Sequence, residues 1–379
     1  MLYKDVVDCS KNEMKLPERA MKSCIGATFF ALQWELSHIE EILSGGGTAE
    51  REISLLRLRL NEYMGTMKEI ILNSESELFQ EDAYNVICDF LIIFCERLGK
   101  KFKFIFKNIF KLVIFKFRNI DLFFIFLILG SNPSLSCLIY QADRQLQELL
   151  NNFIQKYVFV AEEDATQDEH SKIEDLHKKR NFLASFCKLI VYNIIPVQCG
   201  SDVFKHYVKY YNQFGDIIKH TVGKTREINK TSCAITMVNS LITLFQQLQR
   251  ENSKINKQSE EYLNIKELAK RFALSFGLDA IRNREAITVL HRDGIRFAVN
   301  PLENIDDPTG PPPNILFLDI ISEFTNKLLK QDKRLVLQFL DRKIHTGMPS
   351  SRGEDWQPLV SYRNTLIQGT LFIIFFFFF

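Results

Sequence analysis

Two histidines and two cysteines are the side chains in this sequence best suited to chemistry. His177 stands in LHKKRN and His291 in LHRDG, while Cys88 and Cys95 lie seven residues apart, on one face of a helix. General acid–base catalysis needs further polar groups converging on the histidine, and a metal site needs two more ligands beside the cysteines. The neighbouring sequence supplies neither. We therefore predict no catalytic group, no cofactor site and no metal site.

Short catalytic and nucleotide-binding motifs are also missing. The glycine run SGGGTAE (44–50) lacks the lysine of a phosphate-binding loop, and no HExxH, GxSxG or kinase signature occurs. The run is typical of a turn between helices, and Asp216 and Asp293 fit a helix cap and a turn. We expect a protein that is not an enzyme and has no small-molecule substrate.

The composition is that of an ordinary globular protein. The 379 residues are 46% hydrophobic and 25% charged, with a net charge of +2, which gives no general attraction to nucleic acid or anionic lipid. The eight cysteines are scattered, which favours free thiols in a reducing compartment. The first residues contain no apolar stretch, so we expect no secretory signal.

Apolar side chains recur every three or four residues along almost the whole chain, as in Phe182, Phe186 and Ile190. Between proline and glycine breaks we expect antiparallel helix pairs at 141–160 with 171–195, 201–221 with 229–250, 262–277 with 284–299, and 314–330 with 332–345. Each pair carries an apolar stripe that only a neighbouring pair can bury. The sequence predicts an all-α fold, a HEAT-like α-solenoid of antiparallel helix pairs, with an irregular helical bundle as the alternative.

The chain divides into four parts by composition. Residues 1–99 and 137–345 are expected to be helical repeats. Residues 100–136 form an anomalous apolar and basic insert, and residues 346–379 form a tail that ends in consecutive phenylalanines.

The insert has a composition that suggests its origin. Between residues 102 and 129, all but Val113, Arg118 and Asp121 can be encoded by codons of A and T alone. The closing phenylalanines likewise match a run of T. We interpret the insert as translated intron sequence and the poly-Phe end as an artefact of the same kind.

Residues 101–130 also raise the possibility of a membrane segment. A spanning helix needs about 20 largely apolar residues. Lys107, Lys111 and Lys116 interrupt this segment, and each would raise the free energy of membrane insertion by ~2.5–3.5 kcal/mol near the bilayer centre. The uncharged apolar part, Leu122–Leu129, is short. A membrane tether is therefore disfavoured; a surface helix and a nucleic-acid patch are further alternatives.

Several segments resemble the SA (stromal antigen) family of cohesin subunits, in the family's order and at nearly its spacing. The longest is IKELAKRFALSFGLDAIRNREAITVLHRDGIRFA (265–298), and others lie at 171–195, 202–230, 317–334 and 355–366. The resemblance covers most of the chain and corresponds to the C-terminal part of the family's helical-repeat region. We expect the family's N-terminal half and long C-terminal tail to be missing, and the two anomalous segments lie where the resemblance stops.

The resemblance implies a non-catalytic scaffold. Family members are curved HEAT-repeat proteins that bind the kleisin subunit of the cohesin ring, help to hold cohesin on chromatin and support sister-chromatid cohesion. It therefore implies a nuclear, chromosomal location. A peptide-binding, importin-like solenoid is the alternative that the helical pattern leaves open.

The resemblance also nominates contacts with the kleisin. A basic residue in the segment matching HTVGKTREINK contacts the kleisin in the family, which makes Lys224 and Arg226 candidates. An Asp in the segment matching NNFIQKYVF does likewise, and here Lys156 stands in its place. That exchange reverses the charge, and like charges across an interface can cost several kcal/mol.

Clusters of basic residues nominate contacts with DNA. HKKR, the 205–209 segment and KQDKR place positive charge on helix faces, and cations that neutralise phosphates make binding depend on salt. Solvated surface lysines balanced by nearby acids are the alternative. The DNA-contact candidates are Lys178, Lys179, Arg180, Lys205, Lys209, Lys330, Lys333 and Arg334.

Overall fold

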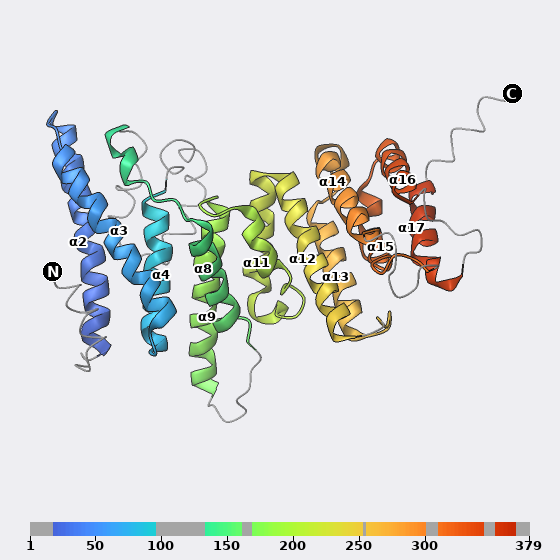
Figure 1. Ribbon diagram of the computed structural model, residues 1–379, viewed down its shortest axis with the longest axis horizontal. Helices are drawn as coiled ribbons and strands as arrows, with labels where there is room; N and C mark the ends of the chain where they lie inside the picture. The colour runs from blue at the N-terminus through green and yellow to red at the C-terminus, as the bar shows by residue number, and fades with distance from the viewer. Residues whose placement is uncertain are drawn as a thin grey trace. The chain divides into compact units, whose positions relative to one another are not determined.

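The structure is a computed structural model that describes residues 18–95, 133–160, 169–252, 255–300, 310–344 and 353–368. Over these ranges every regular element is a helix and no strand occurs, so the predicted all-α class is confirmed. The chain divides into two compact units, Met1–Ile195 and Pro196–Phe379. Figure 1 labels the helices of both.

The first unit stacks long helices side by side. Helices α2 and α3 pack against each other and against α4, and α4 and α8 both contact α9 (Figure 1). The 3₁₀ helix η1 contacts α3. The elements are α2 (Glu18–Ser44), α3 (Glu50–Asn73), α4 (Glu77–Ile93), η1 (Pro133–Leu138), α8 (Arg144–Tyr157) and α9 (Glu169–Val191).

An aromatic cluster joins three helices of this unit. The rings of Tyr84 on α4 and Phe153 on α8 stack with their centroids 4.1 Å apart, and Phe182 on α9 meets the Tyr84 ring edge-on at 5.6 Å. Tyr84 Oη also donates a 3.1 Å hydrogen bond to the backbone oxygen of Phe182. Because the hydroxyl is satisfied, the tyrosine can be fully buried without an unpaired polar atom.

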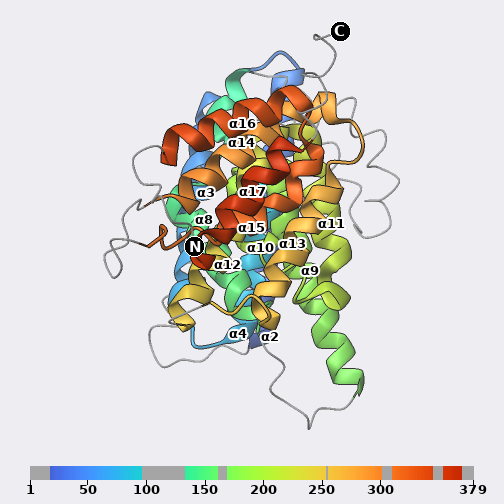
Figure 2. The same ribbon diagram turned by 90° about the vertical axis from the view of Figure 1, so that its right-hand side faces the viewer.

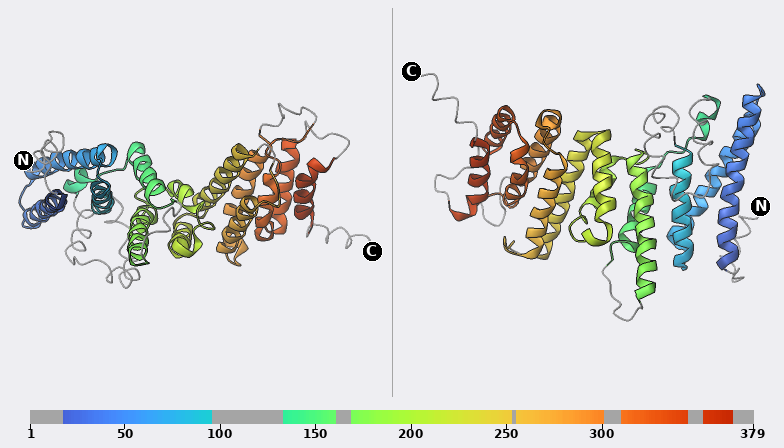
Figure 3. Two further views of the ribbon diagram at one scale, coloured as in Figure 1. Left: turned by 90° about the horizontal axis from the view of Figure 1, so that it is seen from below. Right: turned by 180° about the vertical axis from the view of Figure 1, so that it is seen from behind.

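The second unit continues in the same manner. Helix α12 packs against α11, α13 and α14, and α14 packs against α15 and α16. Figure 2 shows α14, α16 and α17 side by side, and Figure 3 gives the paired helices from below and behind. The elements are η2 (Val197–Gly200), α10 (Ser201–Phe204), α11 (Tyr211–Ile228), α12 (Lys230–Glu251), α13 (Glu260–Ser275), α14 (Ala280–Ala298), α15 (Phe317–Ile321), η3 (Ser322–Lys327), α16 (Lys330–Ile344), η4 (Glu354–Trp356) and α17 (Gln357–Ile367).

Side-chain caps fix where several helices begin. Asp143 accepts a hydrogen bond from the Leu146 amide at 2.7 Å at the start of α8. Asn229, Ser259 and Asp279 likewise accept from the amide three residues later, at the starts of α12, α13 and α14. Each cap satisfies an amide that the helix itself leaves unpaired. The glycine run expected to end the first long helix does so, because α2 stops at Ser44 and Gly46 adopts a left-handed φ of 79°.

Two expected helices are interrupted. The helix expected at 201–221 is divided, since residues 205–210 form turns between α10 and α11. The one expected at 314–330 becomes α15 followed by the 3₁₀ helix η3. In η3, the hydroxyls of Ser322 and Thr325 each bond a backbone oxygen three residues earlier, at 2.7 Å. Such local bonds compete with the regular α-helical ladder.

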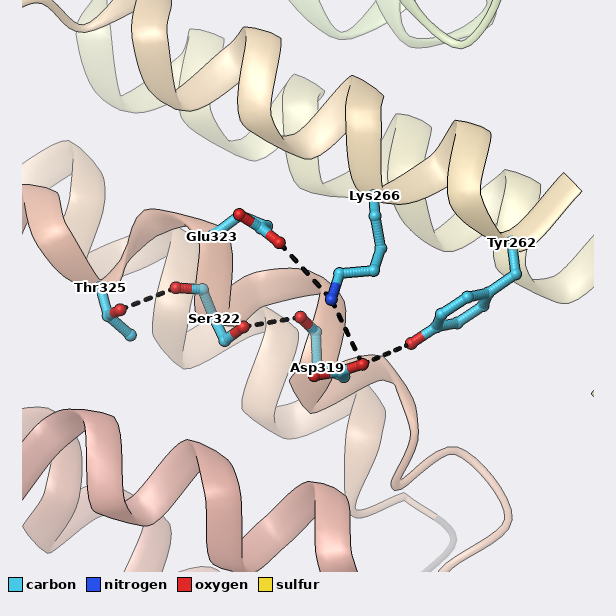
Figure 4. A network of polar contacts seen from close by, with 6 residues as sticks. All are labelled: Tyr262, Lys266, Asp319, Ser322, Glu323 and Thr325. Carbon is cyan, nitrogen blue, oxygen red and sulfur yellow. Dashed lines mark hydrogen bonds and ion pairs between the residues drawn. The ribbon is translucent and has the colours of Figure 1, made fainter. Parts of the chain in front are cut away.

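A polar network fixes α13 against α15 and η3 (Figure 4). Tyr262 Oη donates to Asp319 Oδ2 at 2.9 Å, and Lys266 Nζ lies 3.5 Å from both Asp319 Oδ2 and Glu323 Oε1. Burial, followed by the charge of Asp319, raises the pKa of Tyr262, so the phenol remains a donor. Lys266 therefore pairs with two acidic residues of its own chain.

The segment assigned to the tail contains η4 and α17, and α17 packs against α15 and α16. Residues 96–132, which include most of the proposed insert, and the poly-Phe end (369–379) lie outside the described residues, so the intron and membrane interpretations stay predictions. No helix in the described part of the chain has the length and apolar character needed to cross a bilayer.

Candidate functional site

The two histidines singled out by the sequence have different surroundings, and neither has a catalytic arrangement. His291 on α14 is fully buried, and its Nδ1 lies 2.6 Å from Tyr362 Oη on α17. Burial first, and then the charge of Lys333, lower the pKa of His291 to about 4, so the neutral ring joins two helices. His177 is exposed on α9.

The two cysteines singled out by the sequence are buried in the structure. Cys88 and Cys95 are both shielded from solvent, and burial raises the pKa of the Cys88 thiol, which suppresses the reactive thiolate. Within the described ranges no three His, Cys, Asp or Glu side chains gather as metal ligands would.

The interpretation of Asp216 as a cap and Asp293 as a turn residue is wrong, because both lie inside helices, α11 and α14. The glycine that follows Asp293 suggested a turn but has another role. A Cβ at Gly294 would lie 2.7 Å from Cγ2 of Ile321, so the glycine permits close contact between α14 and α15.

Lys156 lies in the last turn of α8, where a cation is favoured by the helix dipole. Its Nζ donates to Tyr157 Oη at 3.0 Å and lies 4.7 Å from the Tyr157 ring centroid. Tyr157 Oη in turn donates to Gln80 Oε1 on α4. The lysine is exposed, and among the described residues it has no carboxylate partner.

Lys224 and Arg226 lie near the end of α11 in the second unit. Lys224 Nζ pairs with Glu227 at 2.9 Å, whereas Arg226 forms no ion pair within the described ranges. The next turn is anchored, because Lys230 Nζ donates a 3.1 Å hydrogen bond to the backbone oxygen of Arg282. The start of α12 is therefore held against the start of α14.

The junction of α13 and α14 carries apolar side chains that face solvent. Leu278 is 98% exposed, Leu274 72% and Ile281 74%. Ile228, at the end of α11, is also exposed. The contact between Lys230 and Arg282 joins the start of α12, just after Ile228, to the start of α14, next to Ile281. We name the residues near this contact the α11–α14 edge (Arg226, Ile228, Leu274, Leu278 and Ile281). Exposed apolar groups of this kind are typical of an interaction surface.

Five of the DNA-contact candidates interact with groups of the protein itself. Lys178 Nζ lies 2.5 Å from Glu81 on α4, and Lys179 pairs with Asp175 at 2.7 Å. Lys205 pairs with Asp202 at 2.9 Å. Lys333 Nζ donates to the backbone oxygens of Thr365 and Gln368, both at 3.2 Å, which caps the C-terminal end of α17. Arg180 also has a partner inside the molecule.

The other candidates are free to bind elsewhere. Lys209 is exposed and lies over the Tyr210 ring at 5.5 Å. Lys330 and Arg334 are exposed on α16 with no ion-pair partner among the described residues. Sequence analysis missed that Gln338 and Arg342 continue this line at a spacing of four residues. We name Lys330, Arg334, Gln338 and Arg342 the α16 stripe. Their regular spacing of four residues could have indicated in the sequence that they are neighbours on the helix surface.

Comparison with known proteins shows which family this chain is similar to. A family model described as the STAG protein C-terminal domain matches residues 230–369. The chain is 37% identical over 360 residues to cohesin subunit SA-1 of Xenopus laevis and 29% identical over 357 residues to cohesin subunit SA-3 of Homo sapiens, in each case over 93% of the chain. Cohesin subunit scc-3 of Caenorhabditis elegans is 30% identical over 83% of the chain.

These relatives are much longer proteins: the chain spans about a quarter, 26%, of each one's length. The match to the family model falls in the second unit, which carries the α11–α14 edge and the α16 stripe. Together with the extent of the similarity to SA-1 and SA-3, it shows that this chain belongs to the SA family of cohesin subunits.

Proposed function

We propose that the chain serves as a non-catalytic scaffold of the cohesin complex, binding the kleisin subunit and supporting the association of cohesin with chromatin. Sister-chromatid cohesion in the nucleus is the process it would serve. The membership of the SA family supports this proposal, as do the stacked helices of both units.

The α11–α14 edge is the observation that carries the kleisin proposal. Arg226 offers an uncompensated cation, and Leu278 and Ile281 offer apolar area that nothing in the described unit covers. A partner segment with an acidic group beside apolar anchors fits such a surface, because buried anchors supply affinity and charges set register.

Reversal of the charge at Arg226 tests this proposal. Arg226→Glu should weaken binding of the purified central kleisin segment about tenfold or more, since it replaces an attraction with a repulsion. Lys219→Glu is the matched control, because Lys219 is exposed on the same helix outside the edge and its variant should bind like the wild type. Affinity is measured by isothermal titration calorimetry. A wild-type chain that fails to bind the segment at micromolar concentration would refute the proposal.

The α16 stripe supports a second proposed contact, with DNA. Its residues at positions 330, 334 and 342 are exposed cations placed at multiples of four residues, so they form a row that winds partly around α16 over about 18 Å of its length. Such a row can follow the phosphates of one strand.

The salt dependence of DNA binding distinguishes this stripe from the other basic candidates. Changing Lys330, Arg334 and Arg342 together to Gln should reduce the slope of log affinity against log salt by about 3, roughly one for each phosphate that is no longer neutralised. Lys205→Gln should leave the slope unchanged, because Lys205 already pairs with Asp202. Fluorescence anisotropy with a duplex oligonucleotide measures both. An unaltered slope in the triple variant would exclude the stripe as the DNA contact.

A further inference from the structure

Three cationic side chains converge on one aromatic ring at the contact between α14 and α16. The guanidinium carbons of Arg292 and Arg296 lie 5.8 and 5.7 Å from the centroid of the Phe339 ring, and Lys343 Nζ lies 6.0 Å from it. We name this group the Phe339 cluster (Arg292, Arg296, Phe339 and Lys343). The ring is half-buried, so it forms part of the surface between the two helices.

The charges of this cluster are poorly compensated. Asp293 pairs with Arg296 at 2.7 Å, but within the described ranges neither Arg292 nor Lys343 has a carboxylate partner. The two acids of α16 are occupied elsewhere: Asp332 by Arg284 at 2.7 Å and Asp341 by Arg363 at 3.1 Å. Like charges close together repel each other, and an anion bound between them would relieve that repulsion.

Arg292 provides a second, independent observation. Its Nε is buried from solvent and has no hydrogen-bond partner in the described part of the chain. A buried N–H without a partner costs free energy, and native proteins seldom leave one. The guanidinium is thus held against the ring by packing, which orients its remaining N–H groups before any ligand arrives.

We propose that the Phe339 cluster is a binding site for an oxyanion, a carboxylate or phosphate group, carried by a side chain of a partner protein. Arginine presents paired N–H donors that match the oxygens of either group. This interaction goes beyond the kleisin and DNA contacts proposed above and does not rest on them.

Two features favour a peptide over nucleic acid as the partner. The cluster is compact, because all three cations lie between 5.7 and 6.0 Å from the centroid of the same ring. A nucleic acid backbone instead requires cations that are spread along its length. The Phe339 ring is also half-buried and already contacted by the protein's own cations, so it is not a free platform for stacking a base. The α16 stripe meets the requirements of nucleic acid better.

The test uses the full chain and three short glycine–serine peptides that differ at one position, which is phosphoserine, glutamate or serine. The Nε–H resonance of Arg292 is followed by ¹⁵N–¹H spectroscopy, since burial should slow its exchange with water. We expect the phosphoserine and glutamate peptides to shift this resonance and the serine peptide to leave it unchanged. The comparison of the first two identifies which oxyanion is preferred.

Variants separate the cluster from its surroundings. The affinity of each variant for the peptides is measured by isothermal titration calorimetry, because Arg292→Gln lacks the Nε–H group that reports binding. Lys343→Gln, at an exposed position, should weaken binding of the charged peptides about tenfold, and Arg292→Gln at least as much. Arg250→Gln, at an exposed position in the last turn of α12 and outside the proposed sites, should have no effect. Equal binding of the serine peptide, an equal weakening in Arg250→Gln, or a shift produced only by duplex DNA or only by inorganic phosphate would each overturn the proposal.

Discussion

Replacement of Phe317 with alanine should lower the free energy of unfolding of the second unit by about 4 kcal/mol. Phe317 on α15 is fully buried, and its ring centroid lies 5.4 Å from that of Phe245 on α12 and 4.9 Å from that of Phe297 on α14. Truncation would remove the side chain that three helices share, leaving a cavity that their backbones cannot close. Urea denaturation followed by circular dichroism measures the decrease.

Leu278→Ala is the matched control for this prediction. Leu278 is 98% exposed, so its truncation removes almost no buried area and should change stability by less than about 0.5 kcal/mol. The same variant should nevertheless weaken binding of the kleisin segment if the α11–α14 edge is the contact. A Phe317→Ala chain as stable as the wild type would show that the second unit is not held together by this aromatic contact.

The helices were predictable because their stabilising contacts are periodic in the sequence. Phe182, Phe186 and Ile190 recur at the spacing of one helix face, and all three are buried in α9. Breaks were less predictable when hydroxyl side chains caused them. Ser322 and Thr325 convert the end of an expected helix to η3 through local bonds that no apolar pattern reveals.

The surfaces were less predictable, because the availability of a charge depends on residues far away in the sequence. Lys178 is paired with Glu81, and Lys333 caps α17, which follows it much later in the chain. In the sequence, both lysines are indistinguishable from Lys330, which remains exposed without an ion-pair partner among the described residues. The Phe339 cluster was missed for the same reason, since Arg292 and Lys343 meet only when α14 packs on α16.

Acidification should destabilise the second unit through His291. The residue is fully buried, and its pKa is lowered from 6.5 to about 4, chiefly because burial disfavours the charged ring. The unfolded chain therefore takes up a proton that the folded chain does not as pH falls through 6.5. Stability is unaffected by this group above pH 6.5, declines between pH 6.5 and 4, and is lower by about 3 kcal/mol below that range.

The variant His291→Asn isolates this contribution, since Asn keeps a polar group near Tyr362 Oη but does not titrate. At pH 7.5 the variant should be less stable than the wild type, because it loses part of the packing and the 2.6 Å contact. As pH falls to 5, the difference should narrow by about 2 kcal/mol, since only the wild type is destabilised by proton uptake. A constant difference for His291→Asn across this range would mean that the folded protein accommodates a charged ring between α14 and α17, and that burial does not hold this histidine neutral.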